Sequence, residues 1–171
     1  EQLPSTRLRR IHRAHAADFV AHIPGTFAVA LWEEGPGRLT LARDPFGERP
    51  LYVAHRPDGL LLFASEPQAL RASGMVDVEL DREVLAHMLR QGYVPPGRSI
   101  WRGIESLGPG CQLRYQPGQG TPQTTRWWRP PEVVPPDGGL HDPVAWFRDA
   151  LDRSVQDQLV ADVPVGTFLS G

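Results

Sequence analysis

The alternation of apolar runs with turn residues predicts a β-sheet between Gly25 and Glu66. Four short apolar runs stand in this stretch, and Gly, Pro and Asp separate them, which is the pattern of strands joined by tight turns. Because Leu60–Phe63 is apolar at consecutive positions, we expect both faces of its strand to be covered, as in a sheet between other layers. The four expected strands are Thr26–Trp32, Leu39–Ala42, Leu51–Ala54 and Leu60–Ala64.

Helical periodicity flanks this sheet on both sides. Ile11–Ile23 places its apolar side chains at helical spacing, which predicts one amphipathic helix packed on the sheet. Glu66–Ala72 predicts a short helix, and another is expected between Asp81, whose side chain can cap it, and Gly92, which can end it. Cys111–Tyr115 alternates as a further strand, and a last extended segment follows it.

The composition changes near residue 130. Arg129–Asp142 is dense in Pro and Gly and has no periodicity, so we interpret it as lying at a domain boundary. From Pro143 to Leu159 the apolar positions again fall on one face of a helix. The predicted organisation is a first domain over residues 1–131, a linker over 132–142 and the start of a second domain over 143–171.

Length and charge bound the functional class. With 171 residues, the chain can hold one ordinary domain, or one and the start of another. The 40% hydrophobic content and mixed charge are typical of a globular protein. The net charge of −2 provides no footprint for nucleic acid, and no apolar run approaches the ~20 residues that span a bilayer. We therefore expect neither a nucleic acid nor a membrane as partner.

The chain has a single cysteine, Cys111, and its 18 basic residues are all Arg. One cysteine cannot form an internal disulfide, so a cytoplasmic location is expected. The lack of Lys excludes a Walker-type phosphate loop and a Schiff-base lysine within these residues. The chain begins with Glu and stops inside an apparent motif, so we interpret it as part of a longer protein.

The loop between the second and third expected strands carries the most specific signal. Arg43–Tyr52 reads RDPFGERPLY and resembles the RD-x-x-G-x-(K/R)-P-L-Y signature of class II glutamine amidotransferases. Phe63–Glu66, followed by Ala69 and Leu70, resembles the (F/V)-A-S-E-x-x-A-L segment that comes next in these families. The order and spacing of the two motifs make the chain similar to the asparagine synthetase family.

The closing residues carry a second resemblance. Asp162–Gly171 reads DVPVGTFLSG and resembles the start of the D-V-P-(V/Y)-G-x-x-L-S-G-G-x-D-S run of the same family. In that family the completed turn is a pyrophosphate-binding loop, so the resemblance implies ATP contacts by Leu169, Ser170 and Gly171. In isolation, FLSG would be read as a strand end with a Ser-Gly turn. Gly92–Pro95 and Ser99–Ile104 also resemble family segments.

The resemblance implies a mixed α+β and α/β fold. The first part would be a partial Ntn-type α/β/β/α sandwich, and the second part the first helix and strand of an adenine-nucleotide α-hydrolase-like (PP-loop) domain. The implied reaction uses ATP with Mg²⁺, glutamine and a carboxylate substrate, most simply aspartate. Its products would be asparagine, glutamate, AMP and pyrophosphate, and a homodimer is one arrangement that the family adopts.

The resemblance places no catalytic residue in this chain. The family nucleophile is an N-terminal Cys, which would lie upstream, so residues 1–171 alone are expected to be inactive. Cys111 is expected to be a buried structural thiol, and the His residues show no metal-ligand spacing. A structural or interface role is implied for five residues of the motifs, with Arg43 and Asp44 expected to tie the loop down through charge-assisted hydrogen bonds. These residues are Arg43, Asp44, Gly47, Pro50 and Glu66.

Other interpretations stay open at this point. β-Lactam synthetases and peptide-cyclising synthetases use the same scaffold with an internal amine, and a Cys after the initiating Met would argue against them. Amidophosphoribosyltransferases share the RDP-x-G-x-RPL run, but YVPPGRSIWRGI and DVPVGTFLSG would not follow it there. A non-catalytic interaction module that kept the fold is the remaining alternative.

Overall fold

A computed structural model describes residues 5–76, 79–132, 142–159, 161 and 163–168. The chain divides into two compact units, and each is described by itself. One unit spans Arg9–Pro130, and the other contains the C-terminal helix.

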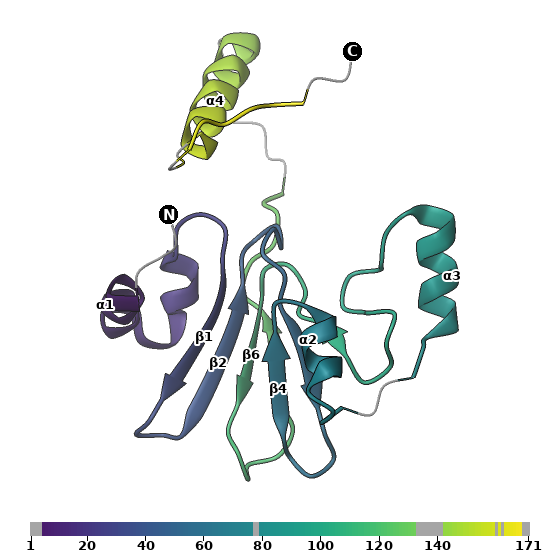
Figure 1. The fold of residues 1–171 in the computed structure, drawn as a ribbon. Helices are drawn as coiled ribbons and strands as arrows, with labels where there is room; N and C mark the ends of the chain where they lie inside the picture. Colours follow the sequence, from purple (N-terminus) through teal and green to yellow (C-terminus); the bar gives the residue numbers. More distant parts are fainter. Residues whose placement is uncertain (1–4, 77–78, 133–141, 160, 162, 169–171) are drawn as a thin grey trace. The chain divides into compact units, whose positions relative to one another are not determined.

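Sheet A of the larger unit is antiparallel and has four strands in the order β1-β2-β6-β7 (Figure 1). In its register Leu41 lies opposite Ala30 on one side and Leu113 on the other, so these three side chains share one face. The strands are β1 (Ala28–Glu33), β2 (Arg38–Arg43), β6 (Cys111–Tyr115) and β7 (Gln123–Arg126).

Sheet B is a smaller antiparallel sheet with the order β4-β3-β5. Its strands are β3 (Tyr52–His55), β4 (Leu61–Ala64) and β5 (Glu105–Ser106). All four strands predicted between Gly25 and Glu66 are therefore confirmed, with ends that shift by one or two residues. Turn residues located these strands because hairpin connections depend on local sequence.

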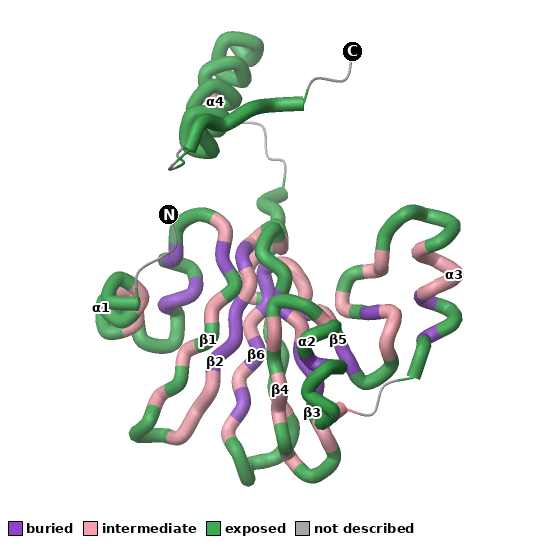
Figure 2. Tube along the Cα trace, viewed as in Figure 1, coloured by how far each residue is buried: buried purple, intermediate pink, exposed green. Residues whose placement is uncertain are grey.

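The main core lies between the two sheets. Figure 2 shows that buried positions concentrate on β2 and β6. The alternating burial of β6 directs Cys111, Leu113 and Tyr115 inwards, as its sequence pattern predicted. These three pack with further buried side chains from both sheets, namely Leu41, Leu51, Val53 and Leu107.

Helical segments lie on the outer sides of the sheets. On sheet B, Leu70 of α2 (Pro67–Ala72) packs with Ala54 and Ile104 in a second cluster. On sheet A, Arg114 of β6 donates a 2.8 Å hydrogen bond to the carbonyl oxygen of Ala17. Ala17 belongs to the 3₁₀ helix η1 (Ala16–His22), which follows α1 (Ser5–His15). Each sheet of the larger unit thus has a helical segment in contact with it.

The prediction of one continuous helix over Ile11–Ile23 is wrong. The chain turns at Ala16, which has a φ of 47°, and continues as the 3₁₀ helix η1. A 3₁₀ helix repeats every three residues, so Val20 and Ile23 come to the same side, and both are buried. The spacing of the apolar residues did not distinguish a 3₁₀ helix from an α-helix. Over so few residues, both kinds of helix place these side chains on nearly the same side.

The prediction that Leu60–Phe63 is covered on both faces holds only in part. Leu61 packs on the main core and Leu62 on the second cluster, but Leu60 and Phe63 are exposed. Leu60 is 41% exposed and Phe63 is 42% exposed. The reason is the position of β4, which is an edge strand of sheet B in the described part of the chain.

Helix α3 (Arg82–Gln91) forms as predicted. The side chain of Asp81 accepts hydrogen bonds from the backbone N–H groups of Glu83 and Val84, which caps the helix. Gly92 ends it with a φ of 78°, a left-handed conformation that glycine adopts without a Cβ penalty.

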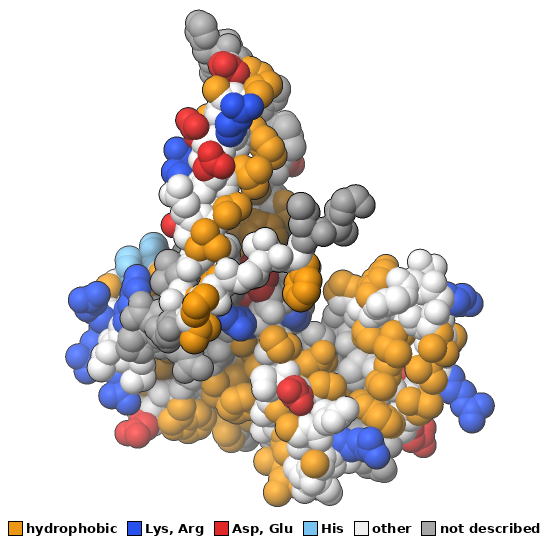
Figure 3. All heavy atoms as spheres, turned by 45° about the horizontal axis from the view of Figure 1, so that its top comes forward, with side chains coloured by type: hydrophobic (Ala, Val, Ile, Leu, Met, Phe, Trp, Pro, Cys, Tyr) orange, Lys and Arg blue, Asp and Glu red, His pale blue; other side chains and the backbone are white. Residues whose placement is uncertain are grey.

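The second unit contains α4 (Pro143–Gln158), which confirms the helix predicted from Pro143. Asp142 caps it by accepting from the N–H groups of Val144 and Ala145. Several apolar side chains of this helix, among them Phe147 and Leu151, are exposed. Figure 3 shows hydrophobic side chains gathered along the helix. Residues 163–168 form no strand, so the strand predicted after this helix is not seen in them. None of the helices in the described ranges is long and apolar enough to cross a bilayer.

Candidate functional site: the Arg43–Tyr52 loop

The carboxylate of Asp44 organises the loop that follows β2. Its Oδ1 accepts hydrogen bonds from the N–H groups of Phe46 and Glu48, and its Oδ2 accepts from the N–H of Arg49 at 3.0 Å. Asp44 itself is 1% exposed. A buried carboxylate that binds successive backbone donors fixes the path of the loop, because each donor would otherwise be left unpaired.

These hydrogen bonds also set the charge state of Asp44. Burial alone would raise the pKa of this carboxyl, but the backbone N–H groups of the loop, with that of Arg49 foremost among them, outweigh it and lower the pKa below its usual range. Asp44 therefore stays ionised at neutral pH, which strengthens each hydrogen bond that it accepts.

The guanidinium of Arg43 crosses from sheet A to sheet B. Its Nε donates to the carbonyl oxygen of Arg49 at 2.7 Å, and its Nη2 donates to that of Gly47. Its Nη1 donates to the Ser106 hydroxyl at 3.1 Å and to the Leu107 carbonyl oxygen at 2.7 Å. The fork-shaped guanidinium suits several acceptors at once. Arg43 and Asp44 therefore bind backbone and hydroxyl groups of the described chain rather than each other.

Two glycines allow close backbone approach beside this loop. A Cβ on Gly47, which has a φ of +69°, would lie 2.9 Å from Pro109 Cγ and 3.1 Å from the Arg43 guanidinium. A Cβ on Gly110 would lie 2.8 Å from the Trp128 carbonyl oxygen. The N–H of Gly110 donates to the Asp44 carbonyl oxygen, and its own carbonyl accepts from Trp128. The loop is thereby connected to the chain after β7.

The apex of the loop carries an exposed aromatic side chain. Phe46 is 73% exposed, and its ring centroid lies 5.1 Å from that of Trp128. The remaining predicted positions lie elsewhere on the surface. Pro50 is exposed just before the buried Leu51, and Glu66 is at the N-cap of α2, where its side chain makes no capping hydrogen bond. The structure therefore brings Arg43, Asp44 and Gly47 together, and it leaves the predicted interface role of all five residues a prediction.

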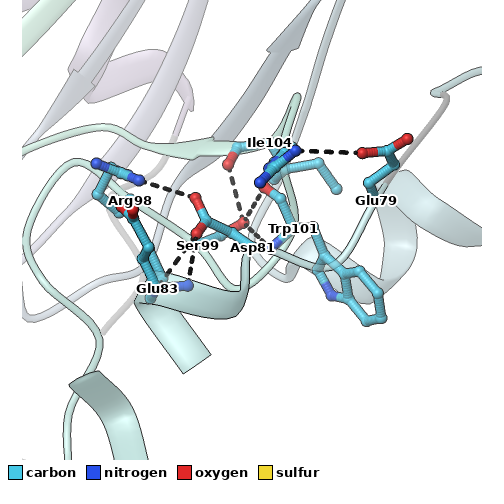
Figure 4. Close-up of polar contacts among 9 residues, drawn as sticks. Glu79, Asp81, Glu83, Arg98, Ser99, Trp101 and Ile104 are labelled. Atoms are coloured by element: carbon cyan, nitrogen blue, oxygen red, sulfur yellow. Dashed lines mark hydrogen bonds and ion pairs between the residues drawn. The ribbon is translucent and has the colours of Figure 1, made fainter. Parts of the chain in front are cut away.

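A second polar cluster, which sequence reasoning did not predict, surrounds the start of α3 (Figure 4). Arg98 donates to Asp81 at 2.8 Å, and this bond, followed by those from the helix N–H groups, lowers the pKa of the Asp81 carboxyl. Arg102 pairs with Glu79 at 3.3 Å. Only the capping role of Asp81 was visible in the sequence, because Arg98 lies 17 residues further on, beyond α3.

The buried hydroxyl of Ser99 holds that loop together. It contacts the carbonyl oxygens of Trp101 and Ile104 at 2.9 and 2.8 Å, and it accepts from the N–H of Trp101 at 3.0 Å. The hollow beside this cluster measures about 190 Å³. Asp81 is paired with Arg98, and Arg102 with Glu79, so we interpret the cluster as a structural brace for α3.

Cys111 lies in the core between the sheets and is buried, which agrees with the predicted structural thiol. In the described ranges, His, Cys, Asp and Glu side chains nowhere gather in threes that could hold a metal ion. The residues predicted to contact ATP, Leu169, Ser170 and Gly171, lie outside the described residues.

Comparison with known families gives two matches in one chain. Residues 8–128 match the profile of a family described as a glutamine amidotransferase domain. Residues 146–171 match a family described as asparagine synthase.

Comparison with curated proteins gives relatives over most of the chain. It is 34% identical to asparagine synthetase [glutamine-hydrolyzing] 3 of Bacillus subtilis, over 90% of this chain and 25% of the relative. It is 31% identical to asparagine synthetase [glutamine-hydrolyzing] 1 of the same organism, over 94% of this chain and 25% of the relative. It is 30% identical to the amidase chyE of Penicillium rubens, over 94% of this chain and 24% of the relative. The chain thus spans about a quarter of the length of these relatives.

Proposed function

This chain belongs to the glutamine amidotransferase domain family, and from that membership we propose that it forms part of a glutamine- and ATP-dependent amide-forming synthetase. The observation that carries the proposal is the order of the two family matches, amidotransferase at 8–128 and asparagine synthase at 146–171. A domain that releases ammonia from glutamine and a domain that consumes it would then follow each other in one polypeptide.

The proposed reaction converts aspartate, glutamine and ATP into asparagine, glutamate, AMP and pyrophosphate. Aspartate is proposed as the acceptor because the relatives from Bacillus subtilis are named asparagine synthetases. The nucleophile that attacks glutamine would lie outside residues 1–171, since Cys111 is buried in the core.

The proposed architecture is an Ntn-type α/β/β/α domain over residues 1–131, a linker over 132–142 and the start of a PP-loop domain over 143–171. The layering of the Arg9–Pro130 unit supports the first assignment, since a helical segment lies on the outer side of each sheet. Leu169, Ser170 and Gly171 would contact ATP. The Mg²⁺ ion that accompanies ATP would be held by residues elsewhere in the polypeptide.

The Arg43–Tyr52 loop has an architectural part in this proposal. Arg43 and Asp44 are occupied by backbone and hydroxyl partners, so neither is free to transfer a proton or bind a substrate. Gly47 permits the close approach to Pro109. With Pro50 and Glu66, these residues would shape the surface of the amidotransferase domain rather than take part in its chemistry.

One alternative keeps the scaffold and changes the acceptor. A relative named as an amidase matches 94% of this chain, so the scaffold occurs in proteins with names other than asparagine synthetase. A β-lactam or peptide-cyclising synthetase would form the amide with an amine instead of ammonia.

The experiment is an isotope transfer assay on the product of the complete reading frame. The enzyme is incubated with glutamine labelled with ¹⁵N in its amide, ATP and aspartate, and we expect the label in the asparagine amide with one AMP per asparagine. A parallel panel of other carboxylates tests the acceptor, and residues 1–171 alone serve as the inactive control. ATP cleavage to AMP without nitrogen transfer would favour the alternative, and glutamate release by residues 1–171 would show that the nucleophile has been misplaced.

A further inference from the structure

Helix α1 has an inner and an outer side. His12 Nε2 lies 3.5 Å from the Glu33 carboxylate on β1, and the His12 ring meets that of Phe19 in η1 edge to face at 5.1 Å. Ile11, the residue before His12, is half-buried. These contacts turn one side of α1 towards η1 and β1, and the opposite side is exposed.

Four arginines make up this exposed side, which we call the arginine face. They are Arg7, Arg9, Arg10 and Arg13, and each is exposed. At about 3.6 residues per turn, they fall within about 160° of the helix circumference. Figure 3 shows Arg side chains gathered on the left, where Figure 1 places α1. Within the part of the chain that the structure describes, none of the four pairs with Asp or Glu.

The arginine face does not stabilise the helix that carries it. Arg7 and Arg10, Arg10 and Arg13, and Arg9 and Arg13 are three or four residues apart, so like charges are neighbours on the helix surface. The helix contains no Asp or Glu that could offset them. Glutamine is about as favourable as arginine in a helix and is uncharged. The stability of α1 therefore does not explain these four charges.

The spacing of the arginine face suits a row of carboxylates. A guanidinium can bind a carboxylate through two parallel hydrogen bonds. From Arg7 to Arg13 the helix rises about 9 Å, so the four groups span less than two turns. A second helix that carries Asp or Glu three and four residues apart repeats this spacing along one of its own sides. Charge and spacing therefore both match an acidic helix.

Two other anionic partners match the arginine face less well. An amphipathic helix binds a membrane by burying its apolar side, but the side of α1 that carries Ile11 is turned towards η1 and β1. Nucleic-acid-binding domains usually carry a large excess of basic charge, whereas this chain has a net charge of −2. The segment that follows α1 also carries the exposed carboxylate of Asp18.

We propose that the arginine face of α1 docks an acidic helix of another protein. The contacts are ion pairs at an exposed surface, so the complex is weak, forms quickly and dissociates at high salt. The inference does not rest on the proposed function, because an ion pair on α1 requires neither glutamine nor ATP.

Two synthetic helical peptides test the proposal on the product of the complete reading frame. Both contain the same numbers of alanine and glutamate. One peptide places its glutamates three and four residues apart on one side, and the other distributes them evenly around the helix. We expect the one-sided peptide to bind about fivefold more tightly by fluorescence anisotropy at low salt, and to lose affinity as salt is added. Equal affinity of the two peptides would overturn the proposal.

A matched pair of charge variants gives a second readout. Changing the whole arginine face to glutamine should weaken binding of the one-sided peptide about tenfold or more. The melting temperature should stay the same or rise, because like-charge neighbours are removed. The control loses the same charge at four other exposed positions and should bind as the wild type does. The first variant carries Arg7→Gln, Arg9→Gln, Arg10→Gln and Arg13→Gln, and the control carries Arg82→Gln, Arg90→Gln, Arg126→Gln and Arg129→Gln.

Several outcomes of these measurements would contradict the proposal. Equal weakening in both variants would show that only net charge matters, and a lower melting temperature of the first variant would give the arginines a structural role. Double-stranded DNA or phosphatidylserine vesicles that bind the arginine face more tightly than the one-sided peptide would identify a different class of partner. Self-association that the first variant abolishes would identify a second copy as the occupant. Each of these results would overturn the proposal.

Discussion

Arg43 donates a 2.7 Å hydrogen bond from Nη1 to the carbonyl oxygen of Leu107, and this bond joins the end of β2 in sheet A to the residue that follows β5 in sheet B. The same guanidinium binds the loop between them, so one side chain fixes the loop and the spacing of the two sheets together.

Replacing Arg43 with Lys should destabilise the protein, although the charge is kept. An ammonium cannot reproduce the fork of donors, so carbonyl groups that Arg43 now binds would lose their partner. We expect the free energy of unfolding in urea to fall by roughly 2–3 kcal/mol. Arg102→Lys is the control, because the Arg102–Glu79 pair is exposed and should contribute little. Similar effects of the two variants would mean that Arg43 does not connect the sheets.

Replacing Asp44 with Asn should destabilise the protein in a pH-dependent way. The folded-state pKa of Asp44 is lowered, so its carboxylate stabilises the protein fully above the unfolded-chain pKa of about 3.9 and loses this effect as the pH falls through the folded-state pKa. We expect Asp44→Asn to cost roughly 1–3 kcal/mol at neutral pH.

The difference between wild type and Asp44→Asn should shrink in acid. Urea unfolding at several pH values from neutral down to about pH 3 measures this difference. It should begin to shrink near the unfolded-chain pKa of about 3.9. A difference that stays constant over this range would show that the charge of Asp44 is not what the loop requires.

Replacing Gly47 with Ala should cost more than the same change at Gly74. The two glycines have similar φ angles, +69° and +66°, but a Cβ at Gly74 would meet nothing within 4 Å. Gly74→Ala therefore measures the backbone cost alone, roughly 1–2 kcal/mol. Gly47→Ala adds a contact with the Pro109 ring and should cost roughly 1–3 kcal/mol more. Equal melting temperatures for the two variants would mean that the loop moves freely away from Pro109.

Replacing Asp81 with Ala should loosen α3 more than Asp142→Ala loosens α4. Both residues cap a helix through two backbone N–H groups, but Asp81 also binds Arg98. We expect Asp142→Ala to speed amide exchange in the first turn of α4 about fivefold, the effect of losing a cap alone. Exchange in the first turn of α3 should accelerate by a larger factor, and a smaller one would argue against the brace formed with Arg98.

The elements that the sequence predicted correctly are those fixed by neighbouring residues. The hairpins, the cap at Asp81 and the stop at Gly92 depend on turn and capping chemistry that is local. The reach of Arg43 to Leu107 was not predictable, because it joins residues that are far apart in the sequence. The 3₁₀ geometry after Ala16 was missed because, over so few residues, the spacing of the apolar positions fits both kinds of helix.

Two further outcomes show the same difference between local features, which the sequence predicts, and contacts with distant residues, which it does not. The strand at Leu61–Ala64 was predicted, but its exposed edge was not, since a sequence pattern records what a strand is suited to meet and not whether that neighbour is present. The motif at Arg43–Tyr52 was recognised before its geometry was known, and the structure identified the backbone and hydroxyl groups that Arg43 and Asp44 bind.

The position of Phe46 has a consequence for molecular recognition. Its own N–H is bound by the Asp44 carboxylate, and its ring lies beside Trp128, so the exposed phenyl group is held in place before anything meets it. A partner surface that packs against this ring would not have to order the loop. Little conformational entropy of the loop would therefore be lost on binding. The adjustment of shape would therefore fall to the receiving surface, and replacing the ring with a smaller side chain would remove contact area without releasing the backbone beneath it.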